Sequence, residues 1–334
     1  MDTPTEKPAP DSTRTVGVLL ERADPAGVVG TQCEAYDPVT HVGQDNRIRF
    51  VPGTTDADRV LCIGSPVPPG GLGRKTARER WRSLRIGRDR ARLERVWDRL
   101  RVHRDRIDVL FYEPPGVVSD EAYAVARERA SRVFGPDDRA THRITLPVWW
   151  SLPESREELL ALEPHPSPAG LVCVTSGKRM IPGHANRLNF IVALRSAEID
   201  FDLFGRGLDA ALLGKGPVES KTAVMHGARF ALAIENDPSC PGYVTEKLWD
   251  ALLAWCLPIY HGSGAWEGLI PPEAVLRLPS LDAEGVEVVR RALADPTAYE
   301  RALPAIAEAR ERILGDTRLV VWYRRDVACG MVDP

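Results

Sequence analysis

The sequence predicts an α/β protein of two domains, each built around a largely parallel sheet. With 334 residues, the chain is long enough for two cores of ordinary size. Short apolar runs alternate with helical patterns along most of its length, which is typical of layered α/β folds. Near the middle, "LPESREELLALEPHPSPAG" (152–170) is first acidic and then rich in proline. We interpret this stretch as the linker between the domains.

The first half of the chain predicts an N-terminal α/β domain over residues 14–160. Its expected strands are "TVGVLLE" at 15–21, "RVLCIG" at 59–64, "IDVLFYE" at 107–113 and "HRITLPVW" at 142–149. Residues 1–13 are polar and rich in proline and lack the apolar core of a signal peptide. We therefore expect them to form a flexible leader.

The second half predicts another α/β domain over residues 168–315, followed by a C-terminal segment, 316–334. Its apolar runs predict strands at 170–176, 199–205, 228–236 and 257–262. Helical patterns occupy 186–196, 245–255 and most of 282–313. This alternation of strands and helices indicates parallel pairing in the second domain as well.

The composition is that of a globular protein without a strong charge bias. Hydrophobic residues make up 43% of the chain, charged residues 27%, and the net charge is −3. Neither nucleic acid nor a membrane is therefore expected as the main partner. The six cysteines show no metal-binding spacing, which favours buried thiols in a cytoplasmic protein. No apolar stretch reaches the roughly 18 residues that a membrane span needs.

An arginine-rich stretch over residues 74–106 stands out against this balanced background. It contains 14 Lys and Arg residues against 5 Asp and Glu. Its partial apolar stripe favours a helix with a solvated basic face. The alternative is a surface for an anionic partner, such as an anionic membrane or a phosphorylated lipid carrier.

The segment "YVTEK" (243–247) begins an expected helix in an unusual way. Thr245 is a good N-cap, and Glu246 in the first turn interacts favourably with the helix dipole. Neither effect explains Lys247 or Tyr243. The segment follows an expected strand, and in open α/β sheets ligands bind at the carboxyl ends of the strands, where helix N-termini favour phosphate. The spacing therefore suggests a nucleotide-diphosphate site.

The longer stretch "FALAIENDPSCPGYVTEKLWDALLAWCLPIYHG" (230–262) resembles the signature of the family 10 glycosyltransferases, the α-1,3/1,4-fucosyltransferases. The matching positions are Glu235, Asn236, Tyr243, Thr245, Glu246, Lys247, Ala251, Pro258, Tyr260 and Gly262. The resemblance is strong over residues 170–280 and loose in the N-terminal half. Three positions depart from the family pattern, namely Ile234, Asp237 and Trp255, and Trp255 stands where a glycine is common.

The resemblance implies a GT-B fold, in which two Rossmann-like domains face each other across a cleft. The C-terminal domain would bind GDP-fucose and the N-terminal domain a glycan or glycosylated acceptor. By this analogy, Glu246 holds the ribose, Lys247 and Tyr243 address the diphosphate, and Asn236 lies at the edge of the pocket. Arg187, in "NRLNF", matches a diphosphate-binding arginine of the family.

In the N-terminal half, Glu113 in "VLFYEPPG" stands where the family has its catalytic base. An inverting transfer from a β-linked sugar nucleotide is a single displacement, so one carboxylate must accept the proton of the acceptor hydroxyl. Cationic side chains would stabilise the charge that grows on the leaving diphosphate, and no metal or other cofactor is then required, although a divalent metal could stimulate the reaction.

Lys178 and Glu235 are weaker candidates for the donor site, because each closes an expected strand at the same sheet edge. Two alternatives stay open at this point. One is the same fold with a different nucleotide sugar. The other is a non-catalytic module that binds nucleotides or polyanions through the stretch 74–106.

Overall fold

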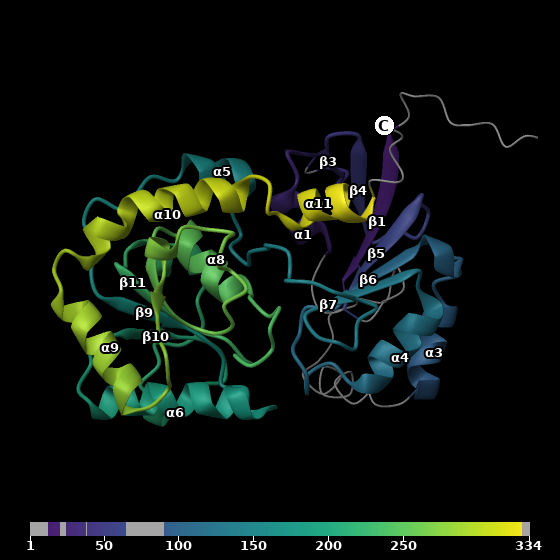
Figure 1. Ribbon diagram of the computed structural model, residues 1–334. Helices are drawn as coiled ribbons and strands as arrows, with labels where there is room; N and C mark the ends of the chain where they lie inside the picture. Colours follow the sequence, from purple (N-terminus) through teal and green to yellow (C-terminus); the bar gives the residue numbers. More distant parts are fainter. Residues whose placement is uncertain (1–12, 21–24, 38, 65–89, 329–334) are drawn as a thin grey trace, which may run out of the picture.

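The computed structural model describes residues 13–20, 25–37, 39–64 and 90–328. Over these residues the chain forms two α/β units that lie side by side, one from the purple and blue segments and one from the teal and green segments (Figure 1). The predicted fold class is therefore confirmed. The expected leader, most of the first half of the arginine-rich stretch, and the end of the C-terminal segment lie outside the described residues.

The N-terminal unit is built on an eight-stranded sheet with the order β2-β3-β4-β1-β5-β6-β7-β8. Its strands are β1 (Arg14–Leu20), β2 (Ala35–Tyr36), β3 (Gly43–Asp45), β4 (Ile48–Pro52), β5 (Arg59–Ile63), β6 (Ile107–Leu110), β7 (Arg132–Gly135) and β8 (His142–Arg143). From β4 to β8 all neighbours are parallel, whereas β2, β3 and β4 pair antiparallel.

Helices cover both faces of this sheet, as side chains that alternate along buried strands require. The helices α3 (Arg90–Asp98) and α4 (Asp120–Arg129) pack on one face, where Trp97 and Tyr123 meet Val60 and Val109. On the other face, α1 (Pro25–Gln32) and α11 (Leu319–Trp322) pack against Val18. Ser119 caps α4 by accepting a hydrogen bond from the amide of Ala122 at 3.2 Å.

The C-terminal unit is built on a parallel five-stranded sheet with the order β10-β9-β11-β12-β13. The strands are β9 (Leu171–Val174), β10 (Asp202–Phe204), β11 (Phe230–Ile234), β12 (Leu257–His261) and β13 (Leu276–Arg277). The surrounding helices are α5 (Arg156–Ala161), α6 (Pro182–Ser196), α7 (Lys221–His226), α8 (Glu246–Leu253), α9 (Ala283–Ala294) and α10 (Ala298–Leu314). Their apolar sides meet the sheet in one large core around Phe190, Leu232 and Trp249.

Most of the predicted elements are confirmed, and two expectations are wrong. The run 142–149 forms only the two-residue strand β8, and the strand before it, β7, was not expected. The interpretation of 152–170 as a linker missed α5, which is capped by Ser155 and Glu158 and buries Leu159 in the core of the C-terminal unit. The proline-rich residues that follow this short helix favoured the linker interpretation.

The chain crosses between the units twice, and the two crossings pair with each other. The amide of Val148 donates to Thr317 at 3.2 Å, and the amide of Leu319 donates to Val148 at 2.8 Å. After this second crossing, α11 returns the chain to the N-terminal sheet, as the yellow ribbon shows (Figure 1). The N-terminal unit is therefore completed by the last described residues of the chain.

A buried carboxylate fastens the returning segment. Asp108 on β6 is fully buried and accepts hydrogen bonds from Arg59 at 2.7 and 2.8 Å and from Arg132 at 2.8 and 3.1 Å. The hydroxyl of Tyr323, just after α11, donates to the same carboxylate at 2.7 Å. Burial opposes the charged form of Asp108, but these three donors outweigh it and lower its pKa.

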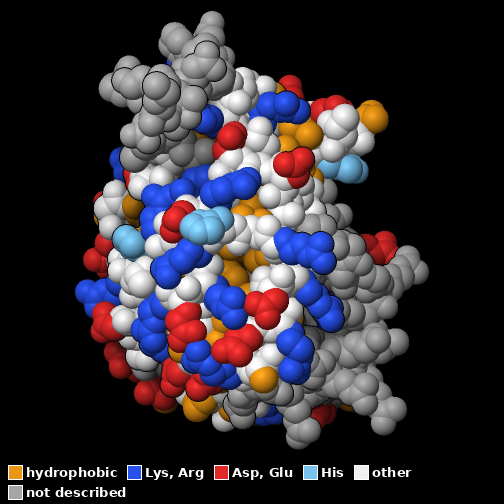
Figure 2. All heavy atoms as spheres, turned by 90° about the vertical axis from the view of Figure 1, so that its right-hand side faces the viewer, with side chains coloured by type: hydrophobic (Ala, Val, Ile, Leu, Met, Phe, Trp, Pro, Cys, Tyr) orange, Lys and Arg blue, Asp and Glu red, His pale blue; other side chains and the backbone are white. Residues whose placement is uncertain are grey.

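In the described part of the arginine-rich stretch, 90–106, some of the basic side chains are paired with acidic neighbours. Arg90 pairs with Glu94 at 2.9 Å and with Glu128 at 2.5 Å, and Arg129 pairs with Asp98 at 3.0 Å. On the face shown in Figure 2, basic and acidic side chains are interspersed. None of the described helices combines the length and apolarity that a membrane crossing requires.

The cluster around Asp108 gives a stability prediction. Tyr323→Phe removes one hydrogen bond and should lower the free energy of unfolding by about 1 kcal/mol. Asp108→Ala leaves two arginines without their counter-charge and should lower it by roughly 3 kcal/mol. Urea denaturation of both variants beside the unmodified chain measures these changes. Equal stability of all three proteins would show that the cluster does not fasten the returning segment.

Candidate functional site

A cavity of about 390 Å³ lies between the two units. Both sheets contribute to it at the point where their strand order reverses. In the C-terminal sheet this point lies between β9 and β11, and in the N-terminal sheet it lies between β1 and β5. Leu20 and Ile63 end the latter two strands and line the cavity. Ligands of open α/β sheets bind at such reversal points.

The wall of the cavity that the C-terminal unit forms depends on Glu235, which follows β11 and is only 1% exposed. Its carboxylate accepts hydrogen bonds from the amide of Thr245 at 2.7 Å and from the hydroxyl of Thr245 at 2.8 Å. The hydroxyl of Tyr260 lies 3.5 Å away. Burial raises the pKa of Glu235, and the hydrogen bonds from Thr245 act against this change. Glu235 thereby fixes the first residue of the turn into α8.

Lys247 and Glu246 extend from this fixed helix start toward the cavity. The ammonium of Lys247 lies 3.0 Å from the hydroxyl of Thr245, 3.4 Å from Glu235 and 3.3 Å from Glu246. Burial acts to lower the pKa of Lys247, but Glu246 and Glu235 outweigh it and raise that pKa. In spite of burial, Lys247 and Lys221 lower the pKa of Glu246 to about 2. Both side chains are therefore charged near neutral pH.

Arg187 reaches the same region from α6. It is 3% exposed, donates one hydrogen bond to Asn236, which follows Glu235, and donates another to the carbonyl of Ser176 at 3.2 Å. The amide of Asn236 in turn donates to the hydroxyl of Tyr243 at 3.4 Å. The Nε atom of Arg187 is buried and has no partner among the described residues. The guanidinium is held at the cavity by Asn236 and Ser176.

Helix α6 approaches the residues that follow β11 closely because its second residue is Gly183. A β-carbon at this position would lie 1.7 Å from the carbonyl oxygen of Asn236. Only glycine permits this approach, which brings Arg187 within hydrogen-bonding distance of Asn236. The sequence "IPGHANR" is thus suited to a helix whose N-terminus touches a strand end.

His184 lies one turn before Arg187 on α6 and also lines the cavity. It is 3% exposed, and its Nδ1 atom accepts hydrogen bonds from the amides of Met180 at 3.2 Å and Ile181 at 3.3 Å. Burial and the neighbouring cations, Arg187 first among them, lower the pKa of His184 to about 4. The imidazole is therefore neutral near pH 7.

The loop that carries Tyr243 is bonded to the N-terminal unit. The amide of Leu146 donates to the carbonyl of Gly242 at 3.0 Å, and the amide of Gly242 donates to Pro136 at 3.3 Å. Tyr243 is 1% exposed and packs into the core of the N-terminal unit. Burial and the carboxylates Glu235 and Glu113 raise its pKa well above the ordinary value. The phenol is therefore a neutral hydrogen-bonding group.

The opposite wall is formed by the N-terminal unit and is largely apolar. Glu113 follows β6 and lines the cavity beside Val117, Val118 and Trp149. The charge of Glu113 contributes to raising the pKa of Lys247, so the two groups interact across the cavity.

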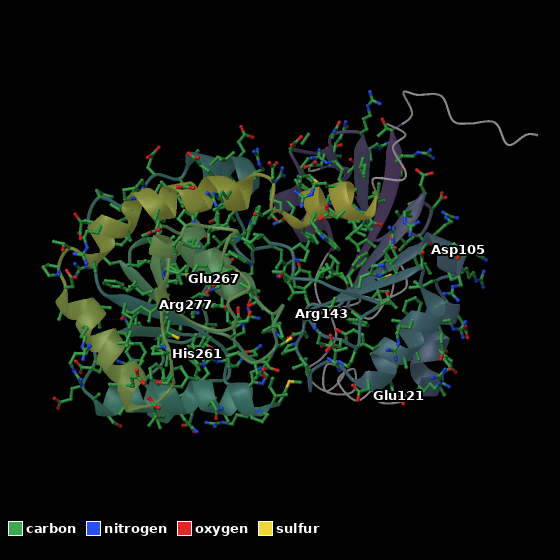
Figure 3. All side chains as sticks on the ribbon, viewed as in Figure 1. Asp105, Glu121, Arg143, His261, Glu267 and Arg277 are labelled. Atoms are coloured by element: carbon green, nitrogen blue, oxygen red, sulfur yellow. The ribbon has the colours of Figure 1, made fainter. Side chains whose placement is uncertain are left out.

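The structure brings together seven of the eight predicted site residues. The cavity is lined by Glu113, Lys178, Arg187, Asn236, Tyr243, Glu246 and Lys247. Glu235 does not line it, because its carboxylate is turned toward Thr245 and supports the site from behind. His261 and the Arg277–Glu267 ion pair, labelled in Figure 3, lie in the C-terminal unit and do not line the cavity either.

Two further cavity residues, His184 and Lys221, were not identified from the sequence. Lys221 starts α7 and is paired with the buried Asp250 of α8. Asp250 also accepts hydrogen bonds from the amide of Ser151 at 2.8 Å and its hydroxyl at 2.6 Å. This contact joins elements far apart in the sequence, and no local pattern indicates it. Among the described residues, no cluster of three or more His, Cys, Asp or Glu side chains could hold a metal ion.

Comparisons with known proteins agree with this geometry. Residues 173–296 match the family model described as Glycosyltransferase family 10 (fucosyltransferase) C-term. An alpha-glucosyltransferase solved with UDP and a 13-mer DNA superposes with a TM-score of 0.52 at 8% identity, over 91% of this chain and 96% of that chain. A crystal structure of alpha1,3-fucosyltransferase gives a TM-score of 0.47 at 17% identity, over 91% and 84% of the two chains.

Residues 173–296 of the C-terminal unit are thus similar to the C-terminal domain of the family 10 glycosyltransferases, and the chain is a glycosyltransferase. Two α/β units that face each other across a cavity form the GT-B fold, to which the superposed alpha-glucosyltransferase is similar. The fold class expected from the sequence is thus confirmed, and so is the resemblance to family 10, over residues 173–296.

The environment of His184 gives a pH prediction. Its resonances in nuclear magnetic resonance spectra should stay constant from about pH 8 to about pH 5, because its pKa is lowered to about 4. The unfolded chain takes up this proton near pH 6.5, so His184 should make the folded state less stable as the pH falls from about 6.5 toward 4. His184→Asn assigns the signal. A midpoint near pH 6.5 would contradict the prediction.

Proposed function

We propose that this glycosyltransferase moves fucose from GDP-fucose to a hydroxyl of a glycan or glycosylated acceptor, with inversion at the anomeric carbon. One observation carries the proposal. Among the described residues, the cavity between the units has cations and a ribose-binding candidate on one wall, and one carboxylate, Glu113, on the other. The family match over residues 173–296 supports the donor.

The donor would bind on the C-terminal wall. Glu246 is charged and can accept hydrogen bonds from two ribose hydroxyls. Lys247 and Arg187 line the cavity, where their positive charges suit a diphosphate. Asn236 holds both Arg187 and Tyr243 through its amide. Lys178 is a further cation on this wall.

The reaction would then be one displacement. The acceptor oxygen attacks the anomeric carbon of fucose, the bond from that carbon to the diphosphate oxygen breaks, and GDP leaves with the electron pair. Glu113 takes the proton from the acceptor hydroxyl as the new bond forms. The transition state resembles an oxocarbenium ion, and Lys247 and Arg187 stabilise the negative charge that develops on the leaving group.

This scheme assigns the leaving-group charge to protein cations, so we propose that turnover requires no metal, although a divalent ion could still stimulate it. We also propose a cytoplasmic location, with which the five described cysteines are compatible because all are buried and free. A peripheral membrane or carrier association through 74–106 remains an additional proposal, to be tested with the full chain.

Calorimetric titration without divalent metal tests the donor. The purified chain is titrated with GDP, GDP-fucose, GDP-mannose and UDP-galactose. Binding of GDP and GDP-fucose, with no heat from UDP-galactose, supports the proposal. Binding of UDP-galactose alone would assign a different donor, and an absence of binding to every nucleotide would favour a module without turnover.

Glu113→Gln tests the base. The amide keeps the shape of the side chain but cannot accept a proton, so turnover should fall by about a hundredfold or more. The affinity for GDP should stay close to that of the unmodified chain, because Glu113 lies on the opposite wall. Initial rates and calorimetry measure the two quantities. Unchanged turnover would remove Glu113 from the mechanism.

Lys247→Met tests the diphosphate contact. Removal of this cation alone leaves Glu235 buried without its counter-charge, so the substitution is made in a Glu235→Gln background. Relative to Glu235→Gln alone, the double variant should bind GDP at least about tenfold more weakly. Thermal unfolding of both variants controls for the fold. Equal affinity for GDP would exclude Lys247 from the donor site.

A further inference from the structure

His184 has a hydrogen-bond donor that none of the described residues uses. Its side chain is 97% buried, since the exposed fraction is 3%, and it lines the cavity between the units. Both recorded hydrogen bonds of the ring go to Nδ1, which accepts the amides of Met180 and Ile181. No described residue is recorded as a partner of Nε2.

These contacts fix the tautomer of the ring. A neutral imidazole carries one proton, and the nitrogen that accepts hydrogen bonds is the one without it. Because Nδ1 of His184 accepts two backbone amides, the proton is on Nε2. The ring is held against the backbone before α6 by one nitrogen, and the other nitrogen is a rigid N–H donor at the cavity.

The charges around the ring indicate what this donor would meet. His184 interacts electrostatically with Arg187, Lys178 and Lys247, which are three of the cations that line the cavity. It also lies in the first turn of α6, a helix of 15 residues, where unpaired backbone amides favour an anion. A neutral N–H group that lies among cations at a helix N-terminus is suited to bind a group with several anionic oxygens.

We propose that the Nε2–H group of His184 donates a hydrogen bond to a diphosphate oxygen of the nucleotide sugar. The proposal rests on the proposed function and adds a neutral ligand-binding residue to its cations. The low pKa of the ring keeps it neutral at working pH, so it does not add repulsion between Arg187, Lys178 and Lys247. The contact strengthens as charge builds on the leaving group, without a proton transfer.

Two substitutions separate this role from a purely structural one. His184→Asn places an amide oxygen near the position of Nδ1, so it keeps the acceptor for Met180 and Ile181 and loses the donor at Nε2. His184→Gln places an amide nitrogen near the position of Nε2, so it keeps the cavity donor and loses the acceptor. Each variant therefore keeps one of the two hydrogen-bonding functions of the ring and loses the other.

The experiment measures GDP affinity by calorimetry and the midpoint of thermal unfolding for both variants and the unmodified chain. We expect His184→Asn to unfold near the unmodified midpoint but to bind GDP about tenfold more weakly. We expect His184→Gln to unfold at a lower temperature and to bind GDP more tightly than His184→Asn.

The opposite order of affinity, or full GDP affinity in His184→Asn, would overturn the proposal and leave the ring a structural role. This failure differs from a failure of the proposed function, since the unmodified chain would still bind GDP. If the unmodified chain bound no guanine nucleotide, the proposed function and this inference would both be overturned. If both variants lost stability and affinity together, the ring would be structural and the inference would again be overturned.

Discussion

The arrangement of the cavity wall that the C-terminal unit forms depends on one buried carboxylate, that of Glu235. Glu235 must be satisfied by protein donors, because an unpaired buried charge is strongly unfavourable. Thr245, Lys247 and Tyr260 surround it, and Gly262 leaves room for it, since a β-carbon there would lie 2.3 Å from the hydroxyl of Tyr260. The spacing of the residues in the stretch 230–262 therefore follows from the contacts that they make with Glu235. Only some of these residues also line the cavity.

The two walls are held in register by backbone contacts at the edge of the cavity. The loop before α8 is bonded to the N-terminal unit through Gly242, and Tyr243 packs in the core of that unit although it belongs to the donor signature. At Gly242 a β-carbon would lie 2.3 Å from the carbonyl oxygen of Ile144, so glycine permits this contact. Asp250 fastens the first crossing of the chain, at Ser151, to α8. The same helix therefore carries Glu246 and Lys247, which line the cavity, and anchors the connection to the N-terminal unit.

The sequence predicted the fold class, most of the C-terminal elements and seven residues that line the cavity, because these depend on local patterns. Buried parallel strands read as short apolar runs, and the signature has a fixed spacing. Prediction from the sequence failed for residues whose positions depend on contacts with distant parts of the chain. His184 looks like any helix residue, and its role follows from the close approach that Gly183 permits. Lys221 is fixed by Asp250, which is distant in the sequence. The linker interpretation failed because proline-rich flanks outweighed the short capped helix α5.

The departures from the family pattern are accommodated outside the cavity. Trp255, which replaces a common glycine, has a φ of 65°, a region that favours glycine. Its indole donates to the carbonyl of Leu162 at 2.6 Å, and Arg310 lies over its ring at 4.3 Å. These contacts offset the backbone strain and tie α8 to α10. Asp237 accepts hydrogen bonds from the amide of Ser239 at 3.0 Å and its hydroxyl at 2.6 Å, and it does not line the cavity. Its carboxylate is used within its own loop, so it does not reduce the excess of positive charge on the cavity wall formed by the C-terminal unit.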